Sequence, residues 1–147
     1  VPLVSVGRSG PETRGGGGAV RVRDTFEGRI VLLIENDPDL RHALTLLLRG
    51  WGADVVEAGN LFEALTQLAD LGLSPDAMLV DYELDEGVCG PDVIARIIAR
   101  HGAIPARIIT GHLTADMRAH CDGAGLEVLP KPIDPAQLEA FLAAAVG

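Results

Sequence analysis

Side chains that could do chemistry follow four of the five short apolar segments in this 147-residue sequence. If these segments are parallel strands of one sheet, their carboxyl ends meet at one edge, which is where such sheets bind ligands. Carboxylates, an amide, a hydroxyl and an ammonium would then lie together. These residues are Glu35, Asn36 and Asp37 after the first segment, Asp81 and Glu83 after the third, Thr110 at the end of the fourth, and Lys131 after the fifth.

The chemistry that suits this set is phosphoryl transfer assisted by a divalent cation. Several carboxylates at one edge repel each other and raise one another's pKa. Mg²⁺ removes that repulsion, and it is satisfied by one or two carboxylates together with waters and a phosphoryl oxygen. A hydroxyl and a lysine beside the cation would suit a transferred phosphoryl group, whose charge must be neutralised from several sides.

Each of these residues also has an ordinary structural explanation. Asn36 or Asp37 can cap the helix that Pro38 begins. Asp81 can form a turn after a strand, and Lys131 can simply be solvated. Their joint occurrence after four segments, rather than any one of them, favours the phosphoryl site.

The segments that would position these residues alternate strictly between two patterns. Short apolar runs alternate with stretches whose apolar residues recur at helical spacing. This alternation predicts an α/β fold, a doubly wound, five-stranded parallel sheet of (βα)5 form with helices on both faces. The expected strands are 30–34, 53–58, 77–80, 106–110 and 126–129, and the expected helices begin at Pro38 and Leu61, cover 93–98 and 113–124, and begin again at Pro135. The first helix is expected to turn Leu40, Ala43, Leu44, Leu47 and Leu48 inward.

Composition bounds the classes of protein that this chain could be. The sequence is 48% hydrophobic but only 3% aromatic, so the core must be aliphatic. Residues 1–29 carry +2, and the net charge of −9 therefore leaves −11 on residues 30–147. Such an acidic domain is a poor nucleic-acid binder, because phosphate contact needs clustered Lys and Arg. It suits a cation or a basic partner surface better.

Residues 1–28 are predicted to be a flexible Gly-rich linker or the tail of a preceding domain, and residues 29–147 a folded domain. The stretch GRSGPETRGGGG at 7–18 carries this prediction. A phosphate-cradling loop is the alternative for its glycines, but no Gly-Lys-Ser/Thr follows it. The chain begins with Val1 and lacks the features of a signal peptide, so we expect a piece of a longer protein.

The cysteines and the apolar runs indicate a cytoplasmic setting. Cys89 and Cys121 show no metal-ligand spacing and make no disulfide framework, so reduced thiols are expected. No apolar run approaches the roughly 18 residues that a membrane span needs.

From about residue 29 to 146 the chain resembles a response-regulator receiver domain, the phosphoacceptor module of bacterial two-component signalling. The resemblance rests on IENDP, LVDYEL, IITG and LPKPI, which occur in the order and spacing of the family's motifs. Any one of these is weak, but four on a matching frame of alternating strands and helices are specific. The resemblance implies a flavodoxin-like strand order, 2-1-3-4-5.

The resemblance also assigns catalytic roles. Asp81 would be the nucleophile that takes a phosphoryl group from a phosphohistidine. Thr110 would bond to the phosphoryl oxygens, and Lys131 would pair with them. The peptide between Lys131 and Pro132 is usually cis in this family.

The resemblance further implies a Mg²⁺ site. Glu35 and Asn36 stand at the two acidic positions, and Asp81 together with the backbone carbonyl of Glu83 would complete the protein ligands. Asn36 stands where the family usually has Asp, so one ligand charge is missing and weaker Mg²⁺ binding is expected. Asp37 is a further candidate ligand.

Three other features depart from the family pattern or modulate it. The loop LDEGVCG is longer by about one residue than usual. Val128 occupies the switch position where an aromatic residue is usual, so the coupled movement of Thr110 and an aromatic ring cannot operate unchanged. Glu83 and His112 occupy positions that tune dephosphorylation in this family. His112 is either a solvated loop residue or a metal or acid–base group, and we favour the former.

The motif combination most resembles receivers at the C-terminus of hybrid sensor histidine kinases. The expected partner is a histidine kinase or a phosphotransfer domain carrying phosphohistidine, with a homodimer as a further option. Contact of this chain with nucleic acid or membrane is not expected. A DNA-binding output domain would need more chain after residue 146.

Two rival hypotheses remain open. A pseudo-receiver would keep the fold and dock partners without phosphorylation, as Asn36 and Val128 suggest. A small phosphatase is disfavoured because Glu83, not a second Asp, stands two residues after Asp81. The domain alone would have only self-phosphorylation and autodephosphorylation chemistry, while the parent protein could be a histidine kinase.

Overall fold

A computed structural model describes residues 25–146. The predicted linker at residues 1–28 therefore lies almost entirely outside the described residues. Within 25–146, no helix has the length and apolar character to cross a membrane.

The fold is a five-stranded parallel sheet of order β2-β1-β3-β4-β5, as the resemblance implied. The register pairs Ile34 with Val80 and Thr110 with Pro130, so neighbouring strands end at nearly the same level. The carboxyl ends therefore form one continuous edge. The strands are β1 (Ile30–Ile34), β2 (Asp54–Ala58), β3 (Ala77–Asp81), β4 (Ala106–Thr110) and β5 (Glu127–Pro130).

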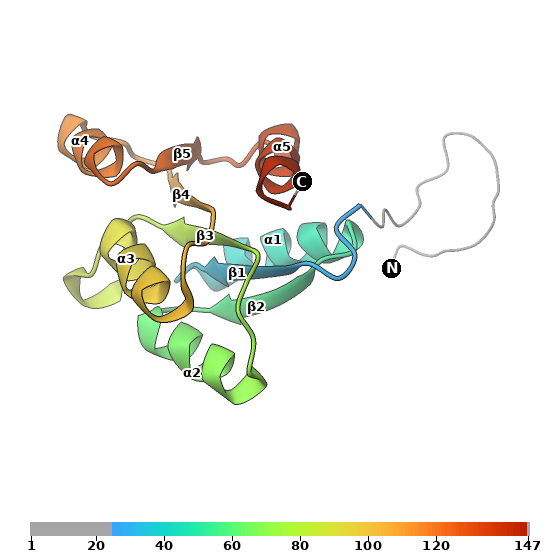
Figure 1. The fold of residues 1–147 in the computed structure, drawn as a ribbon. Coiled ribbons are helices and arrows are strands. Elements are labelled where there is room, and N and C mark those ends of the chain that lie inside the picture. The colour runs from blue at the N-terminus through green and yellow to red at the C-terminus, as the bar shows by residue number, and fades with distance from the viewer. Residues whose placement is uncertain (1–24, 147) are drawn as a thin grey trace.

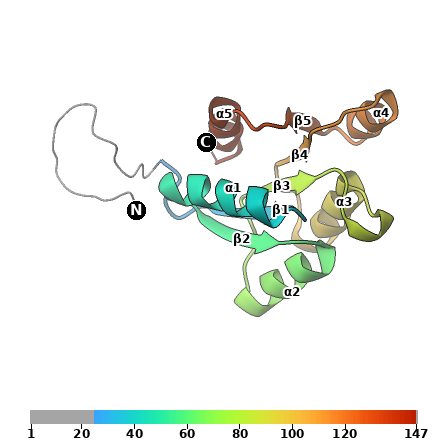
Figure 2. The same ribbon diagram turned by 180° about the vertical axis from the view of Figure 1, so that it is seen from behind.

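The helices lie on both sides of this sheet, as Figure 1 and the reverse view in Figure 2 show. Residues alternate across the strands, so Leu32 joins the core cluster that contacts α2 and α3 while Leu33 joins the one that contacts α1 and α5. The helices are α1 (Pro38–Gly50), α2 (Leu61–Leu71), α3 (Gly90–His101), α4 (Ala115–Gly123) and α5 (Pro135–Val146), with a short 3₁₀ helix η2 (Asp85–Gly87) before α3.

Capping side chains explain where the helices begin. Asp37 Oδ1 accepts from the backbone N–H of Asp39 at 3.0 Å, and Pro38 takes the first helical position of α1. Asn60 caps α2 through the N–H of Glu63 at 2.9 Å. Thr114 caps α4, which explains why this helix starts at Ala115 rather than at residue 113 as expected from sequence.

The inner face of α1 differs by two residues from the sequence prediction. Leu44 and Leu48 are buried as expected, but Ala43 is exposed and Thr45 is 1% exposed instead. The buried side of α1 is therefore rotated slightly from the face that its leucines define. The spacing of apolar residues along the helix does not by itself determine how far the helix is rotated about its axis.

Gly90 is the first residue of α3 and packs directly against the backbone of Asp81 at the end of β3. A Cβ at this position would lie 2.5 Å from the backbone oxygen of Asp81 and 2.8 Å from Ile108 Cδ1. The N–H of Gly90 donates to the carbonyl of Tyr82 at 2.7 Å. The absence of a side chain thus sets how α3 starts beside β3.

Gly90→Ala is expected to lower the free energy of unfolding by about 2 kcal/mol, because the methyl group collides with backbone that cannot move away. Gly123→Ala is the matched control. No atom lies within 4 Å of its added methyl group, and alanine favours helix over glycine. Urea unfolding followed through Trp51, the single tryptophan, measures both. Equal stabilities of the two variants would contradict the close approach.

Candidate functional site

Four residues expected to do chemistry meet at the carboxyl edge of the sheet. Glu35 directly follows β1, Asp81 ends β3, Thr110 ends β4 and Lys131 directly follows β5. Glu35 is 0% exposed, Thr110 4% and Asp81 6%, so the centre of the edge is buried polar surface. The register of β1, β3, β4 and β5 brings these residues together across the sheet.

A buried acid pair with one lysine forms the centre of the site. Lys131 Nζ lies 3.1 Å from Glu35 Oε1 and 3.5 Å from Asp81 Oδ2. The backbone N–H of Glu83 donates to Asp81 Oδ1 at 3.3 Å. Two carboxylates thus share one cation, which leaves an excess negative charge in a buried place.

That charge excess shifts the pKa values of the site. Burial, followed by the neighbouring Glu35 carboxyl, raises the pKa of Asp81 from 3.8 to about 7, although Lys131 and the Glu83 N–H act in the opposite direction. Burial by itself lowers the pKa of Lys131, but Glu35 and Asp81 outweigh it, so the net shift is upward. The lysine is therefore charged, while a proton on Asp81 competes with any cation that could bind there.

The Glu35 side chain is held by its own loop and by α1. Its Oε2 accepts the N–H of Asp37 at 3.0 Å, while its buried Oε1 has the ion pair with Lys131 but no well-directed hydrogen bond. Its backbone carbonyl accepts from Arg41 Nη1 at 2.6 Å. Arg41 also lies 3.7 Å from Glu57. Sequence reasoning missed Arg41, although its position one turn into the helix after Glu35 was a usable signal.

The two residues after Glu35 have different partners, since Asp37 caps helix α1 and Asn36 bonds to Asp85 in the loop after β3. Asp37 caps α1 through Oδ1, so it serves the helix first. Asn36 is exposed, and its Nδ2 donates to Asp85 Oδ1 at 3.2 Å. This bond ties the loop after β1 to the loop after β3, a contact of Asp85 that the sequence did not define. The amide oxygen of Asn36 is its one coordinating atom.

Thr110 and His112 form a turn of their own. Thr110 Oγ1 accepts the N–H of His112 at 3.2 Å and donates to its carbonyl at 3.1 Å. The Thr110 hydroxyl is thus engaged with the loop after β4 rather than with Asp81. The His112 side chain is exposed, as a loop histidine was expected to be. Lys131 continues the pairing of β5 by donating its N–H to the Thr110 carbonyl, and its peptide with Pro132 is cis.

The donor set at this edge fits a hard divalent cation. The donors are carboxylate, amide and carbonyl oxygens, which Mg²⁺ prefers. A buried carboxylate oxygen without a well-directed hydrogen bond and an Asp81 pKa of about 7 both mark charge that a cation would relieve. The residues that would hold it are Glu35, Asn36, Asp81 and, through its backbone carbonyl, Glu83.

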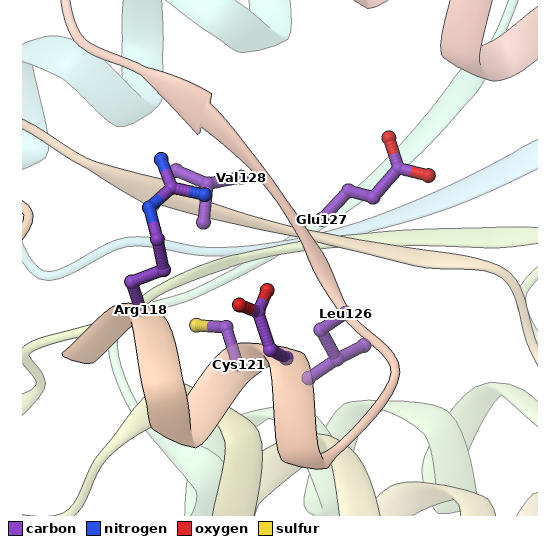
Figure 3. Close-up of a pocket in the computed structure, with 6 residues that line it drawn as sticks. Arg118, Cys121, Leu126, Glu127 and Val128 are labelled. Carbon is purple, nitrogen blue, oxygen red and sulfur yellow. The ribbon is translucent and has the colours of Figure 1, made fainter. Parts of the chain in front are cut away.

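Val128 lies beside a hollow instead of filling it with a ring. Figure 3 shows a pocket between α4 and β5, with Arg118 and Cys121 on the helix and Val128 on the strand. Its volume is about 200 Å³. The space beside the expected switch position is therefore lined by aliphatic and charged side chains.

A doubly wound sheet whose carboxyl edge holds two buried carboxylates and a lysine defines an α/β protein with an acidic, buried polar edge. The chain belongs to the response regulator receiver domain family, whose model matches residues 31–143.

Known relatives agree with this family. The chain is 33% identical over 118 residues to the DNA-binding response regulator MtrA of Mycolicibacterium smegmatis. The matched region covers 80% of this chain and 50% of that protein. It is 31% identical over 116 residues to the response regulator protein PilR of Pseudomonas aeruginosa, covering 78% and 25% respectively. The solved response regulator receiver protein from Burkholderia phymatum has 25% identity and a TM-score of 0.69, covering 81% of this chain and 95% of that one. The chain spans about half the length of the MtrA protein that it matches.

Asp81→Asn is expected to remove a pH-dependent destabilisation of the metal-free fold. The folded-state pKa of Asp81, about 7, exceeds its ordinary 3.8, so the folded chain holds this proton more tightly than the unfolded chain. The free energy of unfolding therefore falls as the pH rises from about 4 to about 7. Because the rise in pKa from 3.8 to about 7 corresponds to about 4 kcal/mol, the variant should be more stable than wild type above this window by up to that amount, and the difference should shrink on acidification.

Urea unfolding with a chelator present, followed through Trp51 between pH 4 and 8, measures this difference. Asp54→Asn, at an exposed position of β2, is the control and should show no such gain. A difference between Asp81→Asn and wild type that stays constant with pH would contradict the raised pKa.

Proposed function

We propose that this chain is a phosphoacceptor receiver that takes a phosphoryl group from a phosphohistidine onto Asp81 in a Mg²⁺-dependent relay. The observation that carries the proposal is the Asp81 carboxylate, 6% exposed at the sheet edge, with the Lys131 ammonium 3.5 Å away and Glu35 buried beside it. The donor would be a histidine kinase or a phosphotransfer domain. Membership of the receiver family supports the same chemistry.

The transfer requires Asp81 as a carboxylate. One oxygen attacks phosphorus, a P–O bond forms, the P–N bond breaks, and its electron pair returns to the departing imidazole. Mg²⁺, when bound, would neutralise charge on the phosphoryl oxygens. Lys131, whose Nζ lies 3.5 Å from Asp81 Oδ2, would help to neutralise the same charge. The N–H of Glu83 holds Asp81 Oδ1 in place, which orients the attacking carboxylate.

The phosphoryl group would be read out through Thr110 and the loop after β4. To bond a phosphoryl oxygen, the Thr110 hydroxyl must give up its bond to the His112 carbonyl. This exchange would loosen the turn that leads into α4. Because Val128 supplies no ring to follow Thr110, the response would be a shift of the loop and of α4 within residues 111–130. Glu83 and His112 stay proposed modulators of dephosphorylation.

The proposed context is the C-terminal receiver of a hybrid sensor histidine kinase, in which residues 1–28 are a linker and residues 29–147 the receiver. The motif combination at IENDP and VDYELDEG supports it. The names of the MtrA relatives point instead to a response regulator that binds DNA through another part of its chain. The charge of −11 on residues 30–147 supports a domain that does not itself contact nucleic acid. A cytoplasmic location is proposed on the same family grounds.

A pseudo-receiver is the alternative that a specific observation favours. Asn36 brings no charge to the cation site, and its amide group is already bonded to Asp85. If that bond closes the cation position, the domain would dock partners through its fold alone, without phosphorylation.

Incubation with Mg²⁺ and acetyl phosphate separates these two functions. We expect the intact mass of the wild-type chain to rise by one phosphoryl group and that of Asp81→Asn to stay unchanged. Asp85→Asn, which alters a carboxylate in the neighbouring loop, should still be modified. A wild-type chain that gains no phosphoryl mass from acetyl phosphate or from a phosphorylated phosphotransfer domain would sink the phosphoacceptor proposal and favour the docking module.

Asn36→Asp is expected to tighten Mg²⁺ binding about tenfold, because a charged oxygen ligand replaces a neutral one. The metal-free variant should be slightly less stable than wild type, since the hydrogen bond to Asp85 becomes a contact between two carboxylates. Isothermal titration calorimetry with Mg²⁺ measures the first effect.

Asn60→Asp provides the control for this change. Asn60 caps α2 at the same edge of the sheet and takes no part in the proposed cation site, and Asp caps helices equally well. Its Mg²⁺ affinity should equal that of wild type. Unchanged affinity in Asn36→Asp would remove residue 36 from the cation site.

A further inference from the structure

A second cluster of metal-ligating side chains, which shares no residue with the acidic edge, lies between the start of α3 and α4. Cys89 precedes α3, Asp92 lies in its first turn and His120 lies near the end of α4. One ligand atom from each, a sulfur, an oxygen and a nitrogen, lies within 4.8 Å of the others. His120 Nδ1 is 3.9 Å from Cys89 Sγ, and His120 Nε2 is 3.7 Å from Asp92 Oδ1.

The backbone around Cys89 is fixed from both sides. Glu83 and Cys89 form an antiparallel bridge, and the next residue, Gly90, donates its N–H to Tyr82 at 2.7 Å. Gly90 packs so closely on Asp81 that any side chain there would collide. The thiol and, three residues later on the same helix start, the Asp92 carboxylate are thus carried on a rigid element, which favours a preformed site.

His120 is oriented by a neighbour that is not itself a metal ligand. Tyr82 Oη lies 2.9 Å from His120 Nδ1, and the two rings meet edge to face with centroids 5.9 Å apart. Histidines that bind metals commonly donate their second ring N–H to an oxygen acceptor, usually a carboxylate, a carbonyl or a water, and the Tyr82 hydroxyl oxygen can accept in the same way. Nδ1 is thus the ring nitrogen that faces both Tyr82 and Cys89, whereas Nε2 faces Asp92. If Nδ1–H donates to Tyr82, Nε2 keeps the free lone pair and is the atom that would bind the metal.

We propose that Cys89, Asp92 and His120 form a Zn²⁺ site that joins the start of α3 to α4. Thiolate, imidazole and carboxylate are the three side-chain donors that Zn²⁺ takes, whereas Mg²⁺ takes oxygen alone. Three protein ligands leave a fourth tetrahedral position for water. Binding requires the Cys89 thiol to release its proton to solvent as the Zn–S bond forms.

The site would act on the helix that the proposed phosphoryl switch moves. Tyr82 directly follows Asp81 in the chain, and His120 lies on α4, so the cluster connects the end of β3 to that helix. Zinc there would fasten α4 to α3 and hold it in the position seen here. This effect goes beyond the proposed phosphoacceptor function, and the existence of the site does not depend on it.

Cobalt substitution in the full chain tests the site directly. Co²⁺ replaces Zn²⁺ in sites of this kind, and thiolate coordination gives a charge-transfer absorption band in the near ultraviolet. We expect that band in the wild-type chain, its loss on addition of Zn²⁺, and its absence in Cys89→Ser. Titration calorimetry should show a Zn²⁺ site whose affinity falls at least tenfold in Cys89→Ser and in His120→Gln.

Two control variants keep the test specific. Cys121→Ala removes the thiol next to His120 in sequence, which is buried and outside the cluster, and should keep the band and the affinity. Asp81→Asn removes the centre of the acidic edge, where Zn²⁺ could bind in place of Mg²⁺, and should also keep the band. Circular dichroism establishes that each variant is folded.

Three outcomes would overturn the proposal. The first is a folded wild-type chain that gives no thiolate band with Co²⁺. The second is Zn²⁺ affinity that is equal in Cys89→Ser and wild type. The third is Zn²⁺ binding lost in Asp81→Asn but kept in Cys89→Ser, which would place the metal at the acidic edge instead. None of these outcomes bears on phosphoryl transfer to Asp81, which acetyl phosphate and intact mass test separately.

Discussion

Two buried carboxylates that face a single lysine are the constraint on which the rest of this structure depends. Glu35 and Asp81 lie at the ends of adjacent strands, and Lys131 reaches both from the far end of the sheet. Burial removes the water that would otherwise screen the two negative charges, so the raised pKa of Asp81 follows from their position. Such a site is stable when a proton or a cation neutralises part of its negative charge, and the repulsion between the two carboxylates destabilises it otherwise. Its readiness for a cation and its sensitivity to pH have the same cause.

The residues around this centre both start helix α1 and position the side chains of the site. Asp37 caps α1 while its own N–H holds Glu35, and Arg41, one turn into the helix, holds the Glu35 carbonyl. The bond between Asn36 and Asp85 joins the loops after β1 and β3 across the mouth of the site. Whether the residues after β1 cap a helix or hold a cation is thus not an exclusive choice. Within one tight turn, Asp37 caps α1 while Glu35 faces Lys131 at the site.

The face that carries α4 differs from the site in its chemistry. A pocket of about 200 Å³ lies between α4 and β5, with Val128 among its lining residues, and α4 contacts α3 through His120 and Asp92. The helix also has a weak amphipathic pattern, which is why its first residue was set by the Thr114 cap and not by its apolar residues. A helix attached by few apolar contacts is the part of the fold that a local change of charge can move most easily.

The sequence alone determined the order of strands and helices, the parallel sheet and the identity of the residues at its carboxyl edge. It could do so because strand burial and helix period leave direct marks on residue order. The start of α4 and the exposure of Ala43 depended on capping and helix rotation, which periodicity does not encode. The sequence also did not determine which side chains come into contact. That Lys131 contacts both carboxylates, that Thr110 is turned toward His112, and that Cys89 and Asp92 meet His120 required the register of the sheet and the close packing at Gly90. Cys89 and His120 are 31 positions apart, and Asp81 and Lys131 are 50 positions apart. Such residues become neighbours only when strands pair and helices pack, so these contacts are set by the tertiary structure.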